Sequence, residues 1–199
     1  MPLVHLTTID GERLEGDLEA AAAPEPAVGA AVVCHPHPLY SGNRQNTVVT
    51  AVADALRAAG FHTLRFDFRS AHDNGVAEQN DVIAAIDLLA SQHADLPLVV
   101  CGYSFGAVVG LNADDTRIAA RIAIAPPLTH MAVEPPKVPT LVLVAEHDQF
   151  CGPDDARAAI ASWPDVELRV IPMADHFFAG SSQLVGTIAA EWLRDRRLT

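Results

Sequence analysis

The residues best suited to chemistry lie in one glycine-flanked segment, Gly102-Tyr103-Ser104-Phe105-Gly106. An apolar run typical of a buried strand precedes it, and a run with helical character follows. At such a strand, turn and helix junction, a serine hydroxyl is lifted into a cleft, and the two glycines are needed because neighbouring backbones pack closely. A glycine-rich turn can produce the same letters by chance, so the flanking elements carry the prediction that Ser104 is a nucleophile.

A serine hydroxyl is a poor nucleophile at neutral pH and needs a base within hydrogen-bonding reach. Of the nine histidines, His176 follows the last predicted strand through the loop Pro172-Met173-Ala174-Asp175 and precedes the final predicted helix. The order along the chain is then nucleophile, acid, base, as in other enzymes with this serine motif. We predict that His176 is the base, although a solitary loop histidine is usually a solvated surface residue.

The imidazole in turn needs a carboxylate that holds its tautomer and stabilises the cation formed on proton transfer. The predicted strand 138–145 runs into Glu146-His147-Asp148, which supplies two acids. Asp148 is the first choice because it lies deeper in the loop, and Glu146 is the alternative. Asp175 is adjacent to the histidine and is expected to shape the turn there.

Acyl transfer develops negative charge on the former carbonyl oxygen, which prepositioned hydrogen-bond donors stabilise. One donor is expected to be the backbone N–H of Phe105, at the start of a helix. The other is expected in the loop after strand 29–34, where Leu39 is the first choice and Tyr40 the second, because the prolines of this loop have no N–H.

The same loop contains the pair His35 and His37, which could also indicate a metal site. The intervening prolines and the lack of a matching carboxylate cluster argue against a metal, and we expect these histidines to hydrogen-bond the loop into shape. Three aromatic residues beside the predicted site are candidates for a substrate pocket, although aromatic residues at such positions are as often part of the core: Tyr103, Phe177 and Phe178.

Apolar strands alternate with helical patterns through most of the chain. We expect strands at 29–34, 61–66, 97–101, 118–125, 138–145 and 166–171, and helices near 46–59, 79–92, 104–112, 153–161 and 182–195. This alternation is typical of a parallel sheet buried on both faces, and such sheets bind ligands beyond the carboxyl ends of their strands. The predicted fold is three-layered α/β.

The start of the chain has a different pattern. Residues 3–9 and 12–18 alternate apolar with polar around Asp10-Gly11, which predicts an antiparallel hairpin with a two-residue turn at one edge of the sheet. The Ala/Pro-rich connector at 20–27 is interpreted as a loop, so residues 1–199 are expected to form a single domain.

The formal net charge of −12 disfavours nucleic acid as a partner. The three cysteines form no CxxC pair, which favours reduced thiols. The chain begins with no signal-peptide pattern and contains no apolar run of membrane-spanning length. These features predict a cytoplasmic protein with no membrane partner, and they leave open whether it forms a homodimer.

Several of these stretches together resemble the small, lidless α/β-hydrolases of bacteria, which are related to serine carboxylesterases and dienelactone hydrolases. The resemblance rests on the serine segment and on three further stretches: His35-Pro36-His37-Pro38-Leu39-Tyr40 with Gly42-Asn43, Phe66-Asp67-Phe68-Arg69, and Ala174-Asp175-His176-Phe177-Phe178. It implies an α/β-hydrolase fold with Ser104, Asp148 and His176 as catalytic triad, and Leu39 and Phe105 as oxyanion donors. The implied reaction is the cleavage of a small-molecule ester or thioester through an acyl-enzyme, without a cofactor.

The sequence also departs from that pattern. Ser70 stands where relatives usually have glycine, and Ala71-His72-Asp73-Asn74 is atypical, which puts the substrate preference in doubt. Dienelactone hydrolases use cysteine as nucleophile, so the serine here argues against that particular activity. Segment 126–137 is too short for a cap domain, so the cleft is expected to be open. Two other readings stay open, because a fold does not define a reaction: a biosynthetic cyclisation, elimination or C–C cleavage with the same triad, and a non-catalytic binding module.

Overall fold

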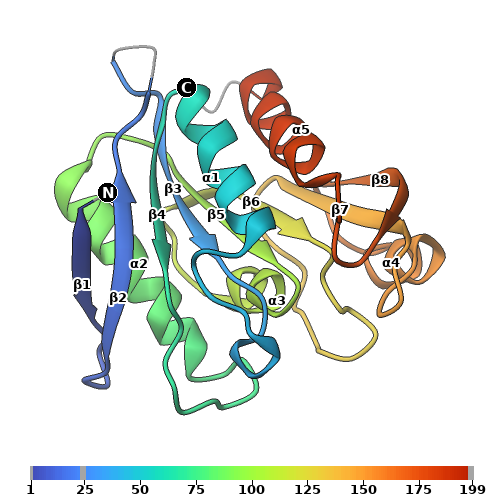
Figure 1. Ribbon diagram of the computed structural model, residues 1–199, viewed down its shortest axis with the longest axis horizontal. Helices are drawn as coiled ribbons and strands as arrows, with labels where there is room; N and C mark the ends of the chain where they lie inside the picture. Colours follow the sequence, from blue (N-terminus) through green and yellow to red (C-terminus); the bar gives the residue numbers. More distant parts are fainter. Residues whose placement is uncertain (1, 23–25, 197–199) are drawn as a thin grey trace.

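A mostly parallel sheet forms the middle layer of the protein (Figure 1). The computed structural model describes residues 2–22 and 26–196, and within them eight strands pair in the order β1-β2-β4-β3-β5-β6-β7-β8. Their bounds are β1 Leu3–Thr7, β2 Arg13–Glu19, β3 Gly29–Cys34, β4 Phe61–Phe66, β5 Leu98–Tyr103, β6 Ile118–Ile124, β7 Thr140–His147 and β8 Val166–Asp175. From β4 to β8 all neighbours are parallel, and β2 pairs antiparallel with β1 and β4.

Helices cover both faces of this sheet. Their bounds are α1 Thr47–Ala58, α2 Glu78–Gln92, α3 Phe105–Asn112, α4 Pro153–Ala159 and α5 Ser182–Asp195. Because side chains alternate along a strand, Val33 and Cys101 pack in the cluster with α1 and α5, whereas Val32 and Val100 pack in the cluster with α2 and α3. Helices α1 and α5 lie side by side over one face (Figure 1). The predicted three-layer α/β fold with an N-terminal hairpin is confirmed.

The predicted strand boundaries agree with the structure to within two residues except at the end of β8, and the first turn is longer than predicted. The last paired residues of the first hairpin are Thr7 and Arg13, so residues 8–12 connect the strands where a two-residue turn was predicted. Thr8 explains the longer turn, because its backbone N–H donates to the Glu12 carbonyl and its hydroxyl accepts from the Glu12 N–H at 2.9 Å. Strand β8 extends four residues beyond the predicted end at 171 and includes Pro172–Asp175.

The connector at 20–27 and the segment between β6 and β7 were both expected to be loops. Within the predicted connector at 20–27, residues 23–25 lie outside the described residues. Segment 125–139, between β6 and β7, holds turns and bends but no helix or strand, which agrees with the absence of a cap.

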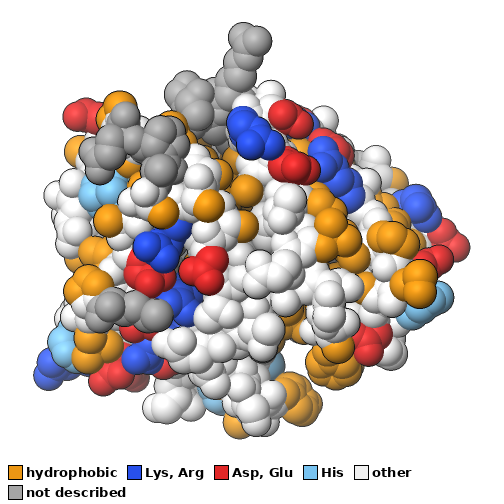
Figure 2. All heavy atoms as spheres, turned by 45° about the horizontal axis from the view of Figure 1, so that its top comes forward, with side chains coloured by type: hydrophobic (Ala, Val, Ile, Leu, Met, Phe, Trp, Pro, Cys, Tyr) orange, Lys and Arg blue, Asp and Glu red, His pale blue; other side chains and the backbone are white. Residues whose placement is uncertain are grey.

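Among the described residues, none of the helices is long and apolar enough to cross a bilayer. On the face in Figure 2, basic and acidic side chains lie next to one another instead of gathering by sign.

Arg69 links the first hairpin to the helix layer. Its guanidinium donates to both oxygens of Asp10, at 2.6 and 3.1 Å, and to Asp81 of α2, at 2.6 and 2.9 Å, while its backbone N–H also donates to Asp81 at 3.0 Å. Hydrogen bonds to Asp10 and Asp81 raise the pKa of Arg69, and burial raises the pKa of Asp81. Because Arg69 is 5% and Asp81 0% exposed, each charge depends on the other for compensation.

We expect Arg69→Met to lower the free energy of unfolding by about 3 kcal/mol or more, because it leaves the Asp81 carboxylate buried without its partner. Arg117→Met is the matched control, since Arg117 also joins two aspartates, Asp87 and Asp115, but lies at the surface. It should cost less than about 1 kcal/mol. Urea denaturation of the three proteins measures both effects, and equal losses would contradict the importance given to the buried pair.

Candidate active site

Ser104 lies in a strained turn between β5 and α3. Its backbone has φ 54° and ψ −118°, a conformation that favours glycine. A Cβ atom on Gly102 would lie 2.2 Å from the Gly106 carbonyl oxygen, and one on Gly106 would lie 2.4 Å from the carbonyl oxygen of His35. The turn is held in place by a hydrogen bond of 2.8 Å from the Ser104 N–H to the carbonyl of Ile124 in β6. Both glycines of the motif are therefore required by close backbone contacts.

The structure brings the serine, histidine and aspartate together in one chain of hydrogen bonds. The distance from Ser104 Oγ to His176 Nε2 is 3.0 Å, and His176 Nδ1 lies 3.0 Å from each carboxylate oxygen of Asp148. The Asp148 side chain is 1% exposed. One of its oxygens also accepts the N–H groups of Phe150 and Cys151, at 2.9 and 3.1 Å, which orients the carboxylate.

The backbone of His176 is held from two sides. Its carbonyl accepts the hydroxyl of Tyr103 at 2.9 Å, and its N–H donates to the side chain of Gln149 at 3.2 Å. The ring of Phe150 stands edge-on to the imidazole, with 4.5 Å between centroids. Gln149 and Phe150 were not among the residues predicted from the sequence. The available signal was their position directly after Asp148, in the same loop.

The two other acids considered for this role lie elsewhere. Glu146 accepts the backbone N–H of Met173 at 2.7 Å and is half exposed. Asp175 accepts the N–H of Phe177 at 3.0 Å and so shapes the turn after β8, in the way expected from the sequence. Asp148 is the acid that contacts the imidazole.

The loop after β3 differs from the sequence prediction. Residues Pro38–Tyr40 form a short 3₁₀ helix, η1, in which the N–H of Leu39 donates to His37 Nδ1 at 3.2 Å and the N–H of Tyr40 donates to the His37 carbonyl at 3.0 Å. The two donors predicted in this loop, the N–H groups of Leu39 and Tyr40, are thus occupied within the loop. In the described part of the chain, by contrast, the N–H groups of His37 and Phe105 have no acceptor.

His35 shapes this loop. It is 1% exposed, its Nε2 accepts the backbone N–H of Phe68 at 3.0 Å, and its Nδ1 lies 2.6 Å from the Pro36 carbonyl, to which it donates. Burial lowers the pKa of His35, so the ring is neutral in the tautomer that these two bonds require. The imidazole therefore connects the loops that follow β3 and β4.

The predicted pocket residues separate into two groups. Tyr103 is 4% exposed and Phe178 1% exposed, and both belong to the core beneath α1 and α5. The prediction that they line a pocket is wrong, because the side chains of both residues pack in that core. Phe177 is 64% exposed and stands edge-on to His176, with 5.6 Å between ring centroids, so it lies at the rim of the site. Phe150, 45% exposed, lies on the same histidine.

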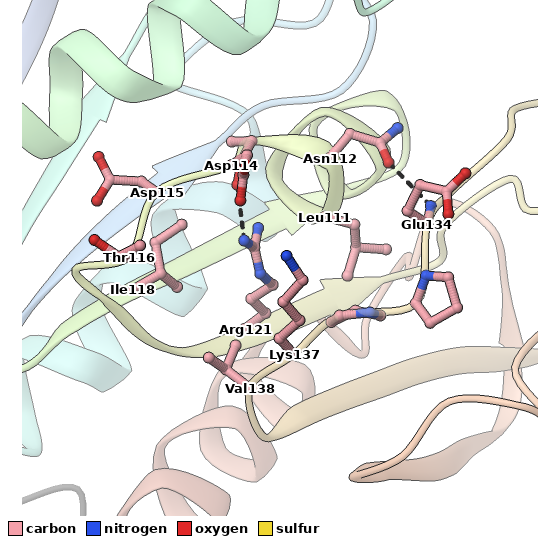
Figure 3. A pocket seen from close by; sticks show the side chains of 13 residues that line it. Leu111, Asn112, Asp114, Asp115, Thr116, Ile118, Arg121, Glu134, Lys137 and Val138 are labelled. Carbon is pink, nitrogen blue, oxygen red and sulfur yellow. Dashed lines mark hydrogen bonds between the residues drawn. The ribbon is translucent and has the colours of Figure 1, made fainter.

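A cavity of about 560 Å³ lies at the opposite ends of the strands, between the end of α3 and the starts of β6 and β7 (Figure 3). Arg121 and Lys137 extend toward it (Figure 3). Burial lowers the pKa of Arg121 to about 10. Its guanidinium donates to the carbonyls of Gly110 and Ala113, which caps the last turn of α3. The cavity is therefore separate from the Ser104 site.

The strain at Ser104 predicts an unusual order of stability. Ser104→Gly should be more stable than Ser104→Ala by about 1 kcal/mol, because glycine adopts the backbone conformation of this turn without a steric cost. The control is Thr187, an exposed residue inside α5, where alanine should be more stable than glycine by about 1 kcal/mol. Thermal and urea unfolding of the four variants test this. Equal stability of the two Ser104 variants would mean that the turn is unstrained.

Comparisons with known proteins agree with this fold. No protein-family model matches the chain. An uncharacterized protein from Rickettsia prowazekii is 31% identical, over 89% of this chain and 82% of that protein. A putative phosphoribosyl transferase from Mycobacterium tuberculosis is 29% identical over 86% of this chain, and the match covers 42% of that longer protein.

Two solved structures have nearly the same fold. An α/β serine hydrolase homologue from Coxiella burnetii superposes with a TM-score of 0.88 at 28% identity, covering 96% of this chain and 97% of that one. A serine hydrolase without a lid from Xanthomonas campestris also gives a TM-score of 0.88, at 29% identity, covering 98% of this chain and 94% of that one. With its sheet order, its uncapped segment between β6 and β7, and these relatives, the chain belongs to the small α/β-hydrolases that lack a lid.

Proposed function

We propose that this protein hydrolyses small carboxylic esters or thioesters through an acyl-enzyme formed on Ser104. The observation that carries the proposal is the unbroken line of 3.0 Å contacts from Ser104 Oγ through the imidazole of His176 to Asp148. The hydrolase fold of the relatives supports the class of reaction.

Acylation begins with the imidazole in the tautomer that carries its proton on Nδ1, because this atom faces the Asp148 carboxylate. The lone pair on Nε2 then faces the hydroxyl of Ser104 and takes its proton as Oγ attacks the substrate carbonyl carbon. When the tetrahedral intermediate collapses, the same proton passes from Nε2 to the leaving alcohol oxygen or thiol sulfur. The acyl group stays on Ser104.

Deacylation repeats these steps with water. His176 Nε2 takes a proton from a water molecule, whose oxygen attacks the acyl carbon, and then returns the proton to Ser104 Oγ as the carboxylic acid leaves. Asp148 stabilises the imidazolium that exists during each transfer. Atoms balance over the cycle, since one water adds to one ester and the enzyme is regenerated.

The negative charge of each tetrahedral intermediate requires donors beside Ser104. We assign the N–H of Phe105 to this task, because it is a free donor at the positive end of α3. For the second donor, the free N–H of His37 replaces the earlier expectation of Leu39 or Tyr40. The contact between Gly106 and the His35 carbonyl supports this assignment, since it holds the start of the loop against the first turn of α3.

The proposed substrates are small or have an exposed acyl end, since segment 125–139 forms no cap over the site. The half-exposed aromatic rings of Phe150 and Phe177 border the catalytic histidine and offer apolar surface to such groups. Both oxygen esters and thioesters fit this open arrangement. Direct comparison of matched substrates distinguishes the two.

The test uses p-nitrophenyl esters of increasing chain length and acyl thioesters with the same acyl groups. Ser104→Ala should lose about 10⁴-fold or more in kcat, and Asp148→Asn about 10⁴-fold, because the asparagine favours the wrong tautomer of the histidine. Glu146→Gln is the matched control and should stay close to the wild type, since Glu146 contacts Met173 and not the imidazole.

Three outcomes would contradict the proposal. A folded wild type that hydrolyses neither class would favour a specialised non-hydrolytic reaction or a binding module. An active Ser104→Ala variant would remove the nucleophile. A loss in Glu146→Gln as large as that in Asp148→Asn would place the acid at the wrong residue.

A further inference from the structure

Two histidine rings lie together beside the nucleophile turn. The ring centroids of His37 and His72 are 5.3 Å apart, and the His37 ring lies 4.5 Å from that of Phe105. His72 belongs to the loop between β4 and α2, whose Gly75, at φ +89°, packs on the same phenylalanine ring. The loop between β4 and α2 therefore borders the proposed oxyanion site.

His37 presents a hydrogen-bond donor. Its Nδ1 accepts the backbone N–H of Leu39, so in the neutral ring the proton is on Nε2. Burial and the neighbouring His72 ring lower the pKa of His37, which keeps this ring neutral at neutral pH. The free Nε2–H can therefore donate to a ligand.

His72 presents the complementary acceptor. Its buried Nδ1 has no hydrogen-bond partner and lies 3.7 Å from a carboxylate oxygen of Glu78. The two oxygens of Glu78 accept the N–H groups of Asp73 and Gly75, at 3.0 and 2.9 Å. Glu78 is 0% exposed. A lone pair on Nδ1 would face this negative charge, so the proton is favoured on Nδ1 and the neutral ring has its lone pair on Nε2.

The two Nε2 atoms are open to a ligand. Neither has a hydrogen-bond partner in the part of the chain that the structure describes, and neither is among the unpaired side-chain atoms sealed from solvent. On rings whose centroids are 5.3 Å apart, one donor and one acceptor match a hydroxyl group, which can accept from the first and donate to the second. A carboxylate could use only the donor, and it would also be opposed by Glu78 and by the net charge of −12.

We propose that His37 and His72 bind a hydroxyl group of the substrate, so that the preferred substrates are hydroxylated esters or thioesters. This inference rests on the proposed hydrolytic function and adds a substrate class to it. His72 is a specificity residue in this scheme. It contacts the substrate away from the reacting carbonyl and takes no part in proton transfer.

The test compares p-nitrophenyl butyrate with p-nitrophenyl 3-hydroxybutyrate, and propyl butyrate with 2-hydroxyethyl butyrate, which places the hydroxyl on either side of the ester. In one of the two pairs, His72→Leu should lower kcat/KM for the hydroxylated ester by about tenfold, which is the value of one neutral hydrogen bond. The kcat/KM for the ester without the hydroxyl should stay within about twofold of the wild-type value. His72→Gln, which keeps an acceptor, should restore part of the loss.

His93→Leu is the control, because His93 also faces a histidine ring, that of His62 at 3.9 Å, but lies at the end of α2. It should leave both ratios unchanged. Since each ratio is measured within one preparation, partial unfolding of a variant cancels. An equal loss on both members of each pair, no loss on either, or a preference for the p-nitrophenyl monoester of succinate would overturn the proposal alone. Absence of all ester and thioester hydrolysis by the wild type would overturn the proposed function as well.

Discussion

The close approach of three backbone segments at the nucleophile turn is the constraint on which the rest of the site depends. Carbonyl oxygens occupy the space where side chains of residues 102 and 106 would otherwise lie. The chain can therefore reverse between β5 and α3 within a single residue, at a conformational cost of about 1–3 kcal/mol for a serine. The surrounding sheet compensates that cost, and the serine hydroxyl consequently projects from the turn toward the ends of the neighbouring strands.

The register of the last two strands supplies the other half of the site. His147 of β7 pairs with Asp175 of β8, after a shift in register beyond Ala145. The next residue along each strand is Asp148 on one side and His176 on the other, so acid and base leave the sheet at the same level. Parallel pairing thus brings together side chains that are 28 residues apart in the chain. Ser104 follows β5, which is two strands from β7 and three from β8 in the order of the sheet.

Patterns that depend on burial could be predicted from the sequence. The predicted bounds of β3 and β4 are correct, since all residues of β3 and all but one of β4 are buried. Ser104, Asp148 and His176 could be selected because each follows a strand, and parallel strands all end at one edge of the sheet.

Features that depend on individual hydrogen bonds or on the phase of a strand could not be predicted. The N–H groups of Leu39 and Tyr40 are occupied by a short turn that His37 caps, and no periodicity reveals such a turn. Tyr103 packs in the core, whereas the serine after it contacts the imidazole of His176, which a list of aromatic neighbours does not show. The pairing of His72 with Glu78 joins two residues of one loop and helix start whose contact depends on the loop conformation.

The central claim is that the imidazole of His176 activates the hydroxyl of Ser104. The most direct measurement is the second-order rate at which a fluorophosphonate modifies the protein, with the adduct located by mass spectrometry, for the wild type and for His176→Ala. Our account predicts an adduct on Ser104 and a rate that falls by about 10²–10⁴-fold in the variant, the usual contribution of a general base. Modification at the same rate in both proteins, or at another residue, would contradict it.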